Sequence, residues 1–121
     1  MTSIEEFMER KPNKSEEQKL FDRQKEILVL LTVLTNREQD LARKINQESE
    51  GYQEAIENAP DQFMRQDLYG SSKIATQRKK DELAELREEI RPLFLKAAKL
   101  DLSHLDFIQN NYQNYVGEPL P

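Results

Sequence analysis

Apolar residues recur at seven-residue intervals in two stretches of the chain, and this spacing constrains the fold more than any other feature. In the first stretch, one position of the repeat holds Leu20, Ile27, Leu34 and Leu41, and a second position holds Leu31, Ile45 and Tyr52. In the second stretch, the two positions hold Leu83, Ile90 and Ala97, and Leu86, Leu93 and Leu100. Residues at this spacing form one stripe along a helix. Two such stripes joined by a polar connection predict an antiparallel helical hairpin.

The composition of the chain favours a thin core. Of the 121 residues, 36% are apolar and 34% are charged, whereas an average globular domain has about 45–50% apolar and about 25% charged residues. Such a chain can supply apolar stripes but no thick interior. The predicted fold class is therefore all-α: a coiled-coil-like antiparallel hairpin of long helices with a shorter C-terminal helix, together forming a small helical bundle.

The domain organisation follows from the position of these stripes. Residues 1–14 carry mixed charges and a proline, and they are expected to form a flexible N-terminal arm with one helical turn near Ile4–Met8. The remainder, 15–121, is long enough for one core and too short for two, so a single helical domain is expected there.

The first long helix is predicted at about 15–58. Its start is marked by Ser15 and Gln18, which have the spacing of a capping box. Its end is marked by Pro60, because a proline disfavours the helical conformation of the residue before it.

The connection between the long helices is predicted at 59–71 and includes a short helix at 61–69. Asn58 is expected to cap this short helix, since Pro60 fits the first helical turn. Gly70, which two serines follow, is expected to end it.

The second long helix is predicted at about 72–100 and is expected to be kinked or broken at Pro92. A proline inside a helix removes one backbone hydrogen bond and clashes with the preceding turn. A C-terminal helix is predicted at about 103–116, with Leu105, Ile108, Tyr112 and Tyr115 on one face.

The run "ILVLLTVLT", Ile27–Thr35, has apolar residues on more than one side of the first helix. Because a helix that is apolar all round is usually buried all round, this run needs at least two neighbours. The neighbours can be helices of an intrachain bundle or a second subunit, and a β-strand is a third alternative. The predicted partner-interface residues are Leu28, Val29, Leu30, Val33, Phe63, Leu105, Ile108 and Tyr112.

No constellation of catalytic or metal-binding residues is evident in the sequence. His104 is the only histidine, and its neighbour Ser103 cannot bond to it as a nucleophile, because adjacent residues on a helix diverge by about 100°. The chain has no cysteine and no Glu-x-x-His motif, and its three glycines are isolated. We expect no enzyme activity, no catalytic residues, no cofactor, no metal and no small-molecule substrate.

The charge balance argues against nucleic acid as the main partner, because the net charge is −5 and phosphate binding needs a basic surface. The exception is "KIATQRKK", Lys73–Lys80, which holds four positive charges and no acidic residue. A regulator that contacts nucleic acid through this segment is therefore an alternative function. The residues that follow, from Asp81 on, offer acidic partners at three- and four-residue spacing, which favours a solvated face instead.

The expected location is the cytoplasm. The N-terminal residues are acidic and lack the apolar region of a secretory signal peptide, although export without such a signal stays open. The apolar run at 27–35 is far shorter than the roughly 20 residues needed to cross a bilayer, so no membrane span is expected.

The segment "FMRQD", with Phe63 and Asp67, matches the F-x-x-x-D pattern of some helical partner proteins of LXG toxins. As a small, acidic, cysteine-free helical hairpin, the chain resembles these partners and the WXG100-type proteins of type VII secretion. The sequence lacks the W-x-G of the WXG100 turn, and its F-x-x-x-D pattern lies mid-chain. The resemblance implies a small helical partner or targeting factor of a type VII-like secretion system.

The function predicted from the residues is a non-enzymatic protein–protein interaction module. Its apolar stripes would bind other helices, as in an adaptor, a chaperone-like partner or an assembly subunit. A homo- or hetero-oligomer is expected.

Overall fold

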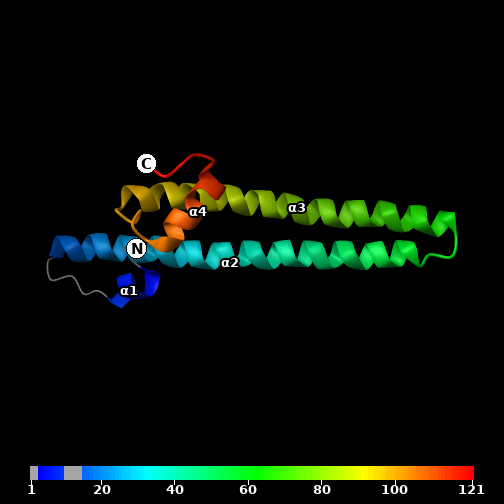
Figure 1. The fold of residues 1–121 in the computed structure, drawn as a ribbon, viewed down its shortest axis with the longest axis horizontal. Helices are drawn as coiled ribbons and strands as arrows, with labels where there is room; N and C mark the ends of the chain where they lie inside the picture. Colours follow the sequence, from blue (N-terminus) through cyan, green and yellow to red (C-terminus); the bar gives the residue numbers. More distant parts are fainter. Residues whose placement is uncertain (1–2, 10–14) are drawn as a thin grey trace. The chain divides into compact units, whose positions relative to one another are not determined.

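The computed structural model describes residues 3–9 and 15–121, with only the backbone described at Ser15. These residues contain the helices α1 (Ile4–Glu9), α2 (Ser15–Glu57), α3 (Gln62–Lys99) and α4 (Asp106–Val116). The long helices α2 and α3 pack antiparallel, and α4 is the shorter C-terminal helix (Figure 1). The predicted all-α fold class is thereby confirmed.

The chain divides into two compact units, each containing part of α2 and part of α3. Unit 1 consists of Met1–Thr35 and Arg87–Pro121, and unit 2 consists of Asn36–Leu86. Unit 1 therefore also holds the short helices α1 and α4, whereas unit 2 holds only the connected portions of the two long helices.

Unit 1 contains an extensive apolar core. Its buried apolar side chains come from all four helices and from the segment before α4. They are Phe7, Phe21, Ile27, Leu28, Leu31, Ile90, Phe94, Ala97, Leu102, Leu105, Ile108, Tyr112 and Val116. Since full burial of one large apolar side chain contributes roughly 1.5–3 kcal/mol, this core is the main source of stability in unit 1.

Aromatic rings link the two short helices to the long ones in unit 1. Phe94 of α3 stacks on Tyr115 of α4, with ring centroids 4.9 Å apart, and on Phe107, at 5.8 Å. Phe7 of α1 lies 5.3 Å from Phe21 of α2, centroid to centroid. The seven-residue pattern did not include Phe94, although its side chain is 0% exposed.

Part of the predicted N-terminal arm is ordered helix. Residues 4–9 form α1, which contains the helical turn expected near Ile4–Met8, and Ser3 caps it by accepting a hydrogen bond from the Glu6 N–H at 3.1 Å. Phe7 is 2% exposed, so this segment packs into unit 1 and is not a free arm. Residues 1–2 and 10–14 of the predicted arm lie outside the described residues.

The segment after α3 reverses the chain through a left-handed residue. Asp101 has a φ of 58°, and the Leu102 N–H donates to the Ala97 carbonyl at 3.1 Å, which is the Schellman arrangement for a helix end. The Gln24 side-chain amide of α2 donates to the Leu100 carbonyl at 2.5 Å. These contacts satisfy carbonyls that the end of α3 would otherwise leave without partners.

In unit 2, a short connection joins α2 to α3. The Met64 N–H donates to the Asp61 carboxylate at 2.8 Å, so Asp61 caps α3 and the predicted cap at Asn58 is wrong. The carboxylate of Asp61 satisfies a backbone N–H that the first helical turn leaves free. Asn58 instead continues the end of α2, where its N–H donates to the Glu54 carbonyl.

Helix α3 runs through both positions at which a break was predicted, Gly70 and Pro92. The predicted helix end at Gly70 and the predicted break at Pro92 are therefore wrong, whereas a bend at Pro92 stays a prediction. Pro92 lies on an exposed side of α3, where water can bond to the carbonyl that lacks its N–H partner. On either side of Pro92, Ile90 and Phe94 are both 0% exposed and hold the helix in the core of unit 1.

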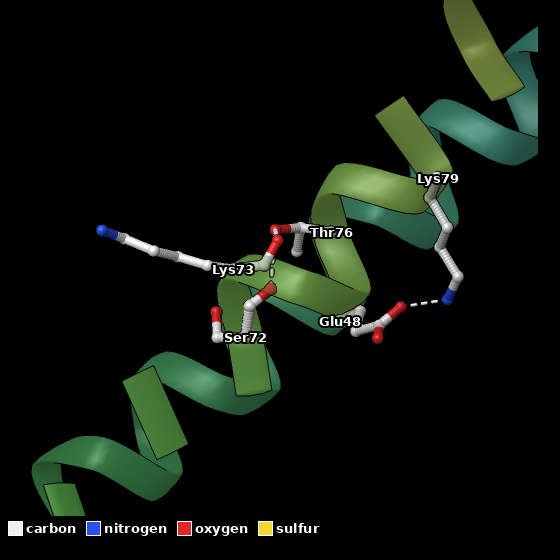
Figure 2. A network of polar contacts seen from close by, with 5 residues as sticks. All are labelled: Glu48, Ser72, Lys73, Thr76 and Lys79. Carbon is white, nitrogen blue, oxygen red and sulfur yellow. Dashed lines mark hydrogen bonds and ion pairs between the residues drawn. The ribbon is translucent and has the colours of Figure 1, made fainter. Parts of the chain in front are cut away.

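Unit 2 buries far fewer apolar side chains than unit 1. Its buried apolar residues are Ile45, Ala59 and Leu86. Polar contacts supplement them: Lys79 of α3 forms an ion pair with Glu48 of α2, while the Thr76 hydroxyl donates to the Ser72 carbonyl at 2.7 Å, as Figure 2 shows.

Candidate functional site

The run Ile27–Thr35 has one buried side and one exposed side. Ile27, Leu28 and Leu31 face the core of unit 1 and are 8%, 1% and 0% exposed. Val29, Leu30 and Val33 are 51%, 41% and 49% exposed. These three residues form a continuous apolar surface along α2, here called the α2 stripe.

The threonines of the run satisfy their hydroxyl groups within α2. The Thr32 hydroxyl donates to the Leu28 carbonyl at 2.8 Å, and the Thr35 hydroxyl donates to the Leu31 carbonyl at 2.7 Å. Each hydroxyl hydrogen therefore already has an acceptor four residues back along the helix. As a result, the run places no unsatisfied hydroxyl donor beside the α2 stripe.

The eight predicted interface residues fall into two groups. Val29, Leu30, Val33 and Phe63 are exposed, and the first three lie together on α2. The other four are buried in unit 1 at 4% exposure or less, namely Leu28, Leu105, Ile108 and Tyr112. These four offer no surface to a partner in this structure, because their side chains are used in the core of unit 1. The interface itself stays a prediction.

Charged residues continue the exposed side of α2 before and after the α2 stripe. Arg23 and Glu26 precede it, Arg37 and Asp40 follow it, and all four are exposed. Asp40 forms an ion pair with Arg43 of the same helix at 2.6 Å. In the part of the chain that the structure describes, Arg23, Glu26 and Arg37 form no ion pair.

Unit 2 has a second set of exposed apolar side chains. Phe63 and Ile74 are 77% and 71% exposed, and Met64 and Tyr69 are about half exposed. A shallow hollow of about 470 Å³ lies beside Tyr69 and is also lined by Ile56 and Arg65. Met64, Tyr69 and Ile74 were not among the predicted interface residues. For Ile74 the sequence does contain a signal. This residue lies outside the seven-residue positions that continue the second stripe towards the N-terminus, so it is not expected to face the first long helix.

The two residues of the F-x-x-x-D pattern are both exposed. Phe63 and Asp67 lie within the first two turns of α3. An anchor that packs on the hairpin end would be buried, so the exposure of Phe63 argues against that structural role.

The basic segment Lys73–Lys80 agrees only in part with the solvated, ion-paired helix face that the sequence suggested. Lys79 pairs with Glu48 across unit 2, and Lys73 points away from this pair, with its ammonium 4.5 Å from the centre of the Tyr69 ring (Figure 2). Within the described residues, Arg78 and Lys80 form no ion pair with the acidic residues that follow. The Gln77 amide donates to Asp81 instead, at 2.9 Å.

The residues weighed for catalysis do not assemble. His104 is exposed, and its ring lies 6.4 Å from that of Phe7. No hydrogen bond joins His104 to Asp101 or Ser103 in the described chain. Residues 3–9 and 15–121 contain no cluster of three or more side chains suited to hold a metal ion. None of the helices in the described ranges is both long enough and apolar enough to cross a membrane.

Comparison of the chain with protein-family models, with curated proteins and with solved structures finds no match. The function is therefore inferred from the exposed surfaces of α2 and α3.

Proposed function

We propose that this chain is a non-enzymatic protein–protein interaction module that binds another helix along the α2 stripe. The observation that carries the proposal is the exposure of Val29, Leu30 and Val33 on a helix whose opposite side is fixed in the core of unit 1. Because the core of unit 1 already holds this part of α2 in place, little conformational entropy is lost when a partner binds.

The free energy gained by covering the α2 stripe supports binding of modest affinity. Full burial of an aliphatic side chain contributes roughly 1.5–3 kcal/mol relative to exposure. Because the three residues are already about half buried, covering them would contribute on the order of 2–4 kcal/mol. This is enough to bias association, but flanking contacts must supply the remainder.

A helix is the partner that fits this surface. Val29 and Val33 are four residues apart and form a ridge along α2, with Leu30 beside it. Ridges of this kind pack into the grooves of a neighbouring helix. The partner helix can belong to a second copy or to another protein, as in an adaptor, a chaperone-like partner or an assembly subunit.

A second candidate function follows from the exposed Phe63 and Asp67. Both lie on one side of the start of α3, and Phe63 is 77% exposed. They would serve as recognition residues if the chain is a small helical partner or targeting factor of a type VII-like secretion system.

The test is to place charges on the α2 stripe. Val29→Glu combined with Val33→Glu should release a bound helix and leave a smaller, still helical species in sedimentation velocity. A matched control, Met64→Glu with Ile74→Glu, makes the same kind of change on unit 2 and should leave the assembly unchanged. Circular dichroism checks that both variants remain folded.

Two results would overturn the proposal. The first is a wild-type protein that sediments as a monomer at up to about 100 µM and co-purifies with no partner at native expression level. The second is outright unfolding of the Val29→Glu/Val33→Glu variant, which would show that the α2 stripe belongs to the core.

A further inference from the structure

We infer that the helix covering the α2 stripe is α2 of a second copy, in an antiparallel pair about a twofold axis between Leu31 and Thr32. This inference deepens the proposed function and rests on it. It is carried by the order of charged and apolar residues along the exposed side of α2.

The exposed side of α2 carries a short heptad pattern. Its positions are separated alternately by three and four residues: Arg23, Glu26, Leu30, Val33, Arg37 and Asp40. This is the spacing of the a and d positions of a coiled coil. All six residues lie on one continuous helix, Ser15–Glu57, so their spacing along it is set by helix geometry.

In an antiparallel pair, each a position faces a d position of the partner helix. One register places Leu30 opposite Val33, Glu26 opposite Arg37, and Arg23 opposite Asp40. The twofold axis makes each of these pairs occur twice. From Arg23 to Asp40 every charged residue then meets an opposite charge, and the apolar residues meet at the centre. At the next positions outward Lys19 would face Lys44 of the partner copy, so the paired stretch ends at Arg23 and Asp40.

Other arrangements of the same two helices do not satisfy the pattern. A parallel pair would place Glu26 against Glu26 and Arg37 against Arg37, which are repulsive contacts. An antiparallel pair shifted by seven residues would place Leu30 against Asp40 and Val33 against Arg37. Charge complementarity therefore selects one register and one direction, and it selects a second copy over an unrelated helix.

The charged groups are available for these contacts. Arg23, Glu26 and Arg37 form no ion pair within the described residues. Asp40 uses one carboxylate oxygen, Oδ1, in its contact with Arg43, so its other oxygen can accept from Arg23 of the partner copy. Ion pairs at an exposed rim contribute little energy but fix the register, whereas the central apolar contacts favour association.

The pair should be weak. The six positions extend over about 26 Å of helix at 1.5 Å per residue. A single helix-to-helix contact of this length buries less surface than a standard stable interface, so a dissociation constant in the micromolar range, below about 100 µM, is expected.

Disulfide trapping tests the direction and register. The chain has no cysteine, so introduced thiols are the only ones present. A Glu26→Cys protein mixed with a tagged Arg37→Cys protein should form the mixed disulfide on mild oxidation. A Glu50→Cys protein, changed at an exposed site of unit 2, is the control for random collision and should not cross-link with either. Cross-linking of Glu26→Cys to itself in preference to the mixed product would indicate a parallel pair and overturn the inference.

Charge exchange gives an independent readout. Glu26→Arg alone, or Arg37→Glu alone, places like charges in two layers of the pair and should raise the dissociation constant about tenfold or more. The double variant Glu26→Arg/Arg37→Glu restores opposite charges and should return to within about threefold of the wild type. Glu26 and Arg37 are three turns apart, so they cannot compensate for one another within a single chain.

Failure of this inference can be told apart from failure of the proposed function. A wild-type monomer without the mixed disulfide, or a double variant as weak as the single ones, overturns the twofold pair. If the wild type still co-purifies with a partner that Val29→Glu/Val33→Glu releases, the helix-binding function stands and its occupant is another protein. If neither self-association nor a partner is detected, both proposals fall.

Discussion

Unit 1 and unit 2 use the same two long helices with very different amounts of core. Among the described residues, thirteen of the sixteen buried apolar side chains belong to unit 1 and three belong to unit 2. Two helices can cover only one side of each other, so the remaining sides of α2 and α3 in unit 2 stay open to solvent. In unit 1, α1 and α4 supply the additional side chains that enclose a core.

This difference separates two roles along one pair of helices. Unit 1 has the burial needed for most of the stability, and the exposed apolar residues of its part of α2 are the α2 stripe and Leu20. Unit 2 exposes Phe63, Met64, Tyr69 and Ile74 and has little core to anchor them. Segments with few buried apolar contacts open at lower free energy than the global unfolding transition. We therefore expect unit 2 to open more readily than unit 1.

The largest expected effect is the loss of Phe94 in unit 1. Phe94→Ala removes a ring that is 0% exposed and stacked on two other aromatic rings. The free energy of unfolding should fall by about 3–5 kcal/mol, out of a typical total of about 5–15 kcal/mol. Denaturation in urea measures this. A loss below about 1 kcal/mol would contradict the assignment of Phe94 to the core.

Truncation of an apolar side chain in unit 2 should lower the free energy of unfolding by less. Leu83 is only partly buried, so Leu83→Ala should lower the free energy of unfolding by about 1–2 kcal/mol. Native-state hydrogen exchange gives a second comparison, because amides of 62–80 should exchange faster than those of 87–99, although both ranges belong to α3. Equal protection of the two ranges would contradict the contrast between the units.

The features that the sequence predicted correctly depend on local signals. The predicted helix at about 15–58 agrees with α2, Ser15–Glu57, because the start signal and the nearby proline act on adjacent residues. The two seven-residue stripes likewise predicted the antiparallel packing of α2 and α3.

The errors arise where tertiary packing outweighs a local preference. Proline inside a helix costs about 3 kcal/mol and glycine about 1 kcal/mol relative to alanine. At Pro92, burial of Ile90 and Phe94 on either side offsets that cost. No single-sequence rule measures this balance, because it depends on residues that approach only in the folded chain.

The candidate site was predicted in part for the same reason. The run Ile27–Thr35 was recognised as apolar on several sides, but periodicity cannot tell which side the chain itself covers. Leu28 faces the core of unit 1, whereas Val29 and Val33 stay open. The folded position of α4, with Ile108 and Tyr112 buried, could not be derived from spacing.

A smaller effect is expected for the ion pair within unit 2. The side chains of Lys79 and Glu48 are 36% and 23% exposed, so solvent screens their attraction. A double-mutant cycle with Lys79→Ala and Glu48→Ala should give a coupling of about 0.5–1 kcal/mol that decreases in high salt. Lys80→Ala, at an exposed lysine without an ion pair in the described chain, is the control. A coupling of zero would show that Leu86 and Ile45 hold this part of the two helices without help from the pair.

An effect of similar size, with opposite signs in the two units, tests whether α3 is continuous. Gly70 lies within α3 and a Cβ added there meets nothing within 4 Å, so Gly70→Ala should raise the free energy of unfolding by about 0.5–1 kcal/mol. Gly117, at the end of α4, has a φ of 85°, which an alanine adopts only with strain, so Gly117→Ala should lower it by about 1 kcal/mol. Thermal denaturation of the two variants measures both changes in stability. If Gly70→Ala is destabilising, the chain turns at Gly70 and the short separate helix predicted from the sequence is the better description of this part of unit 2.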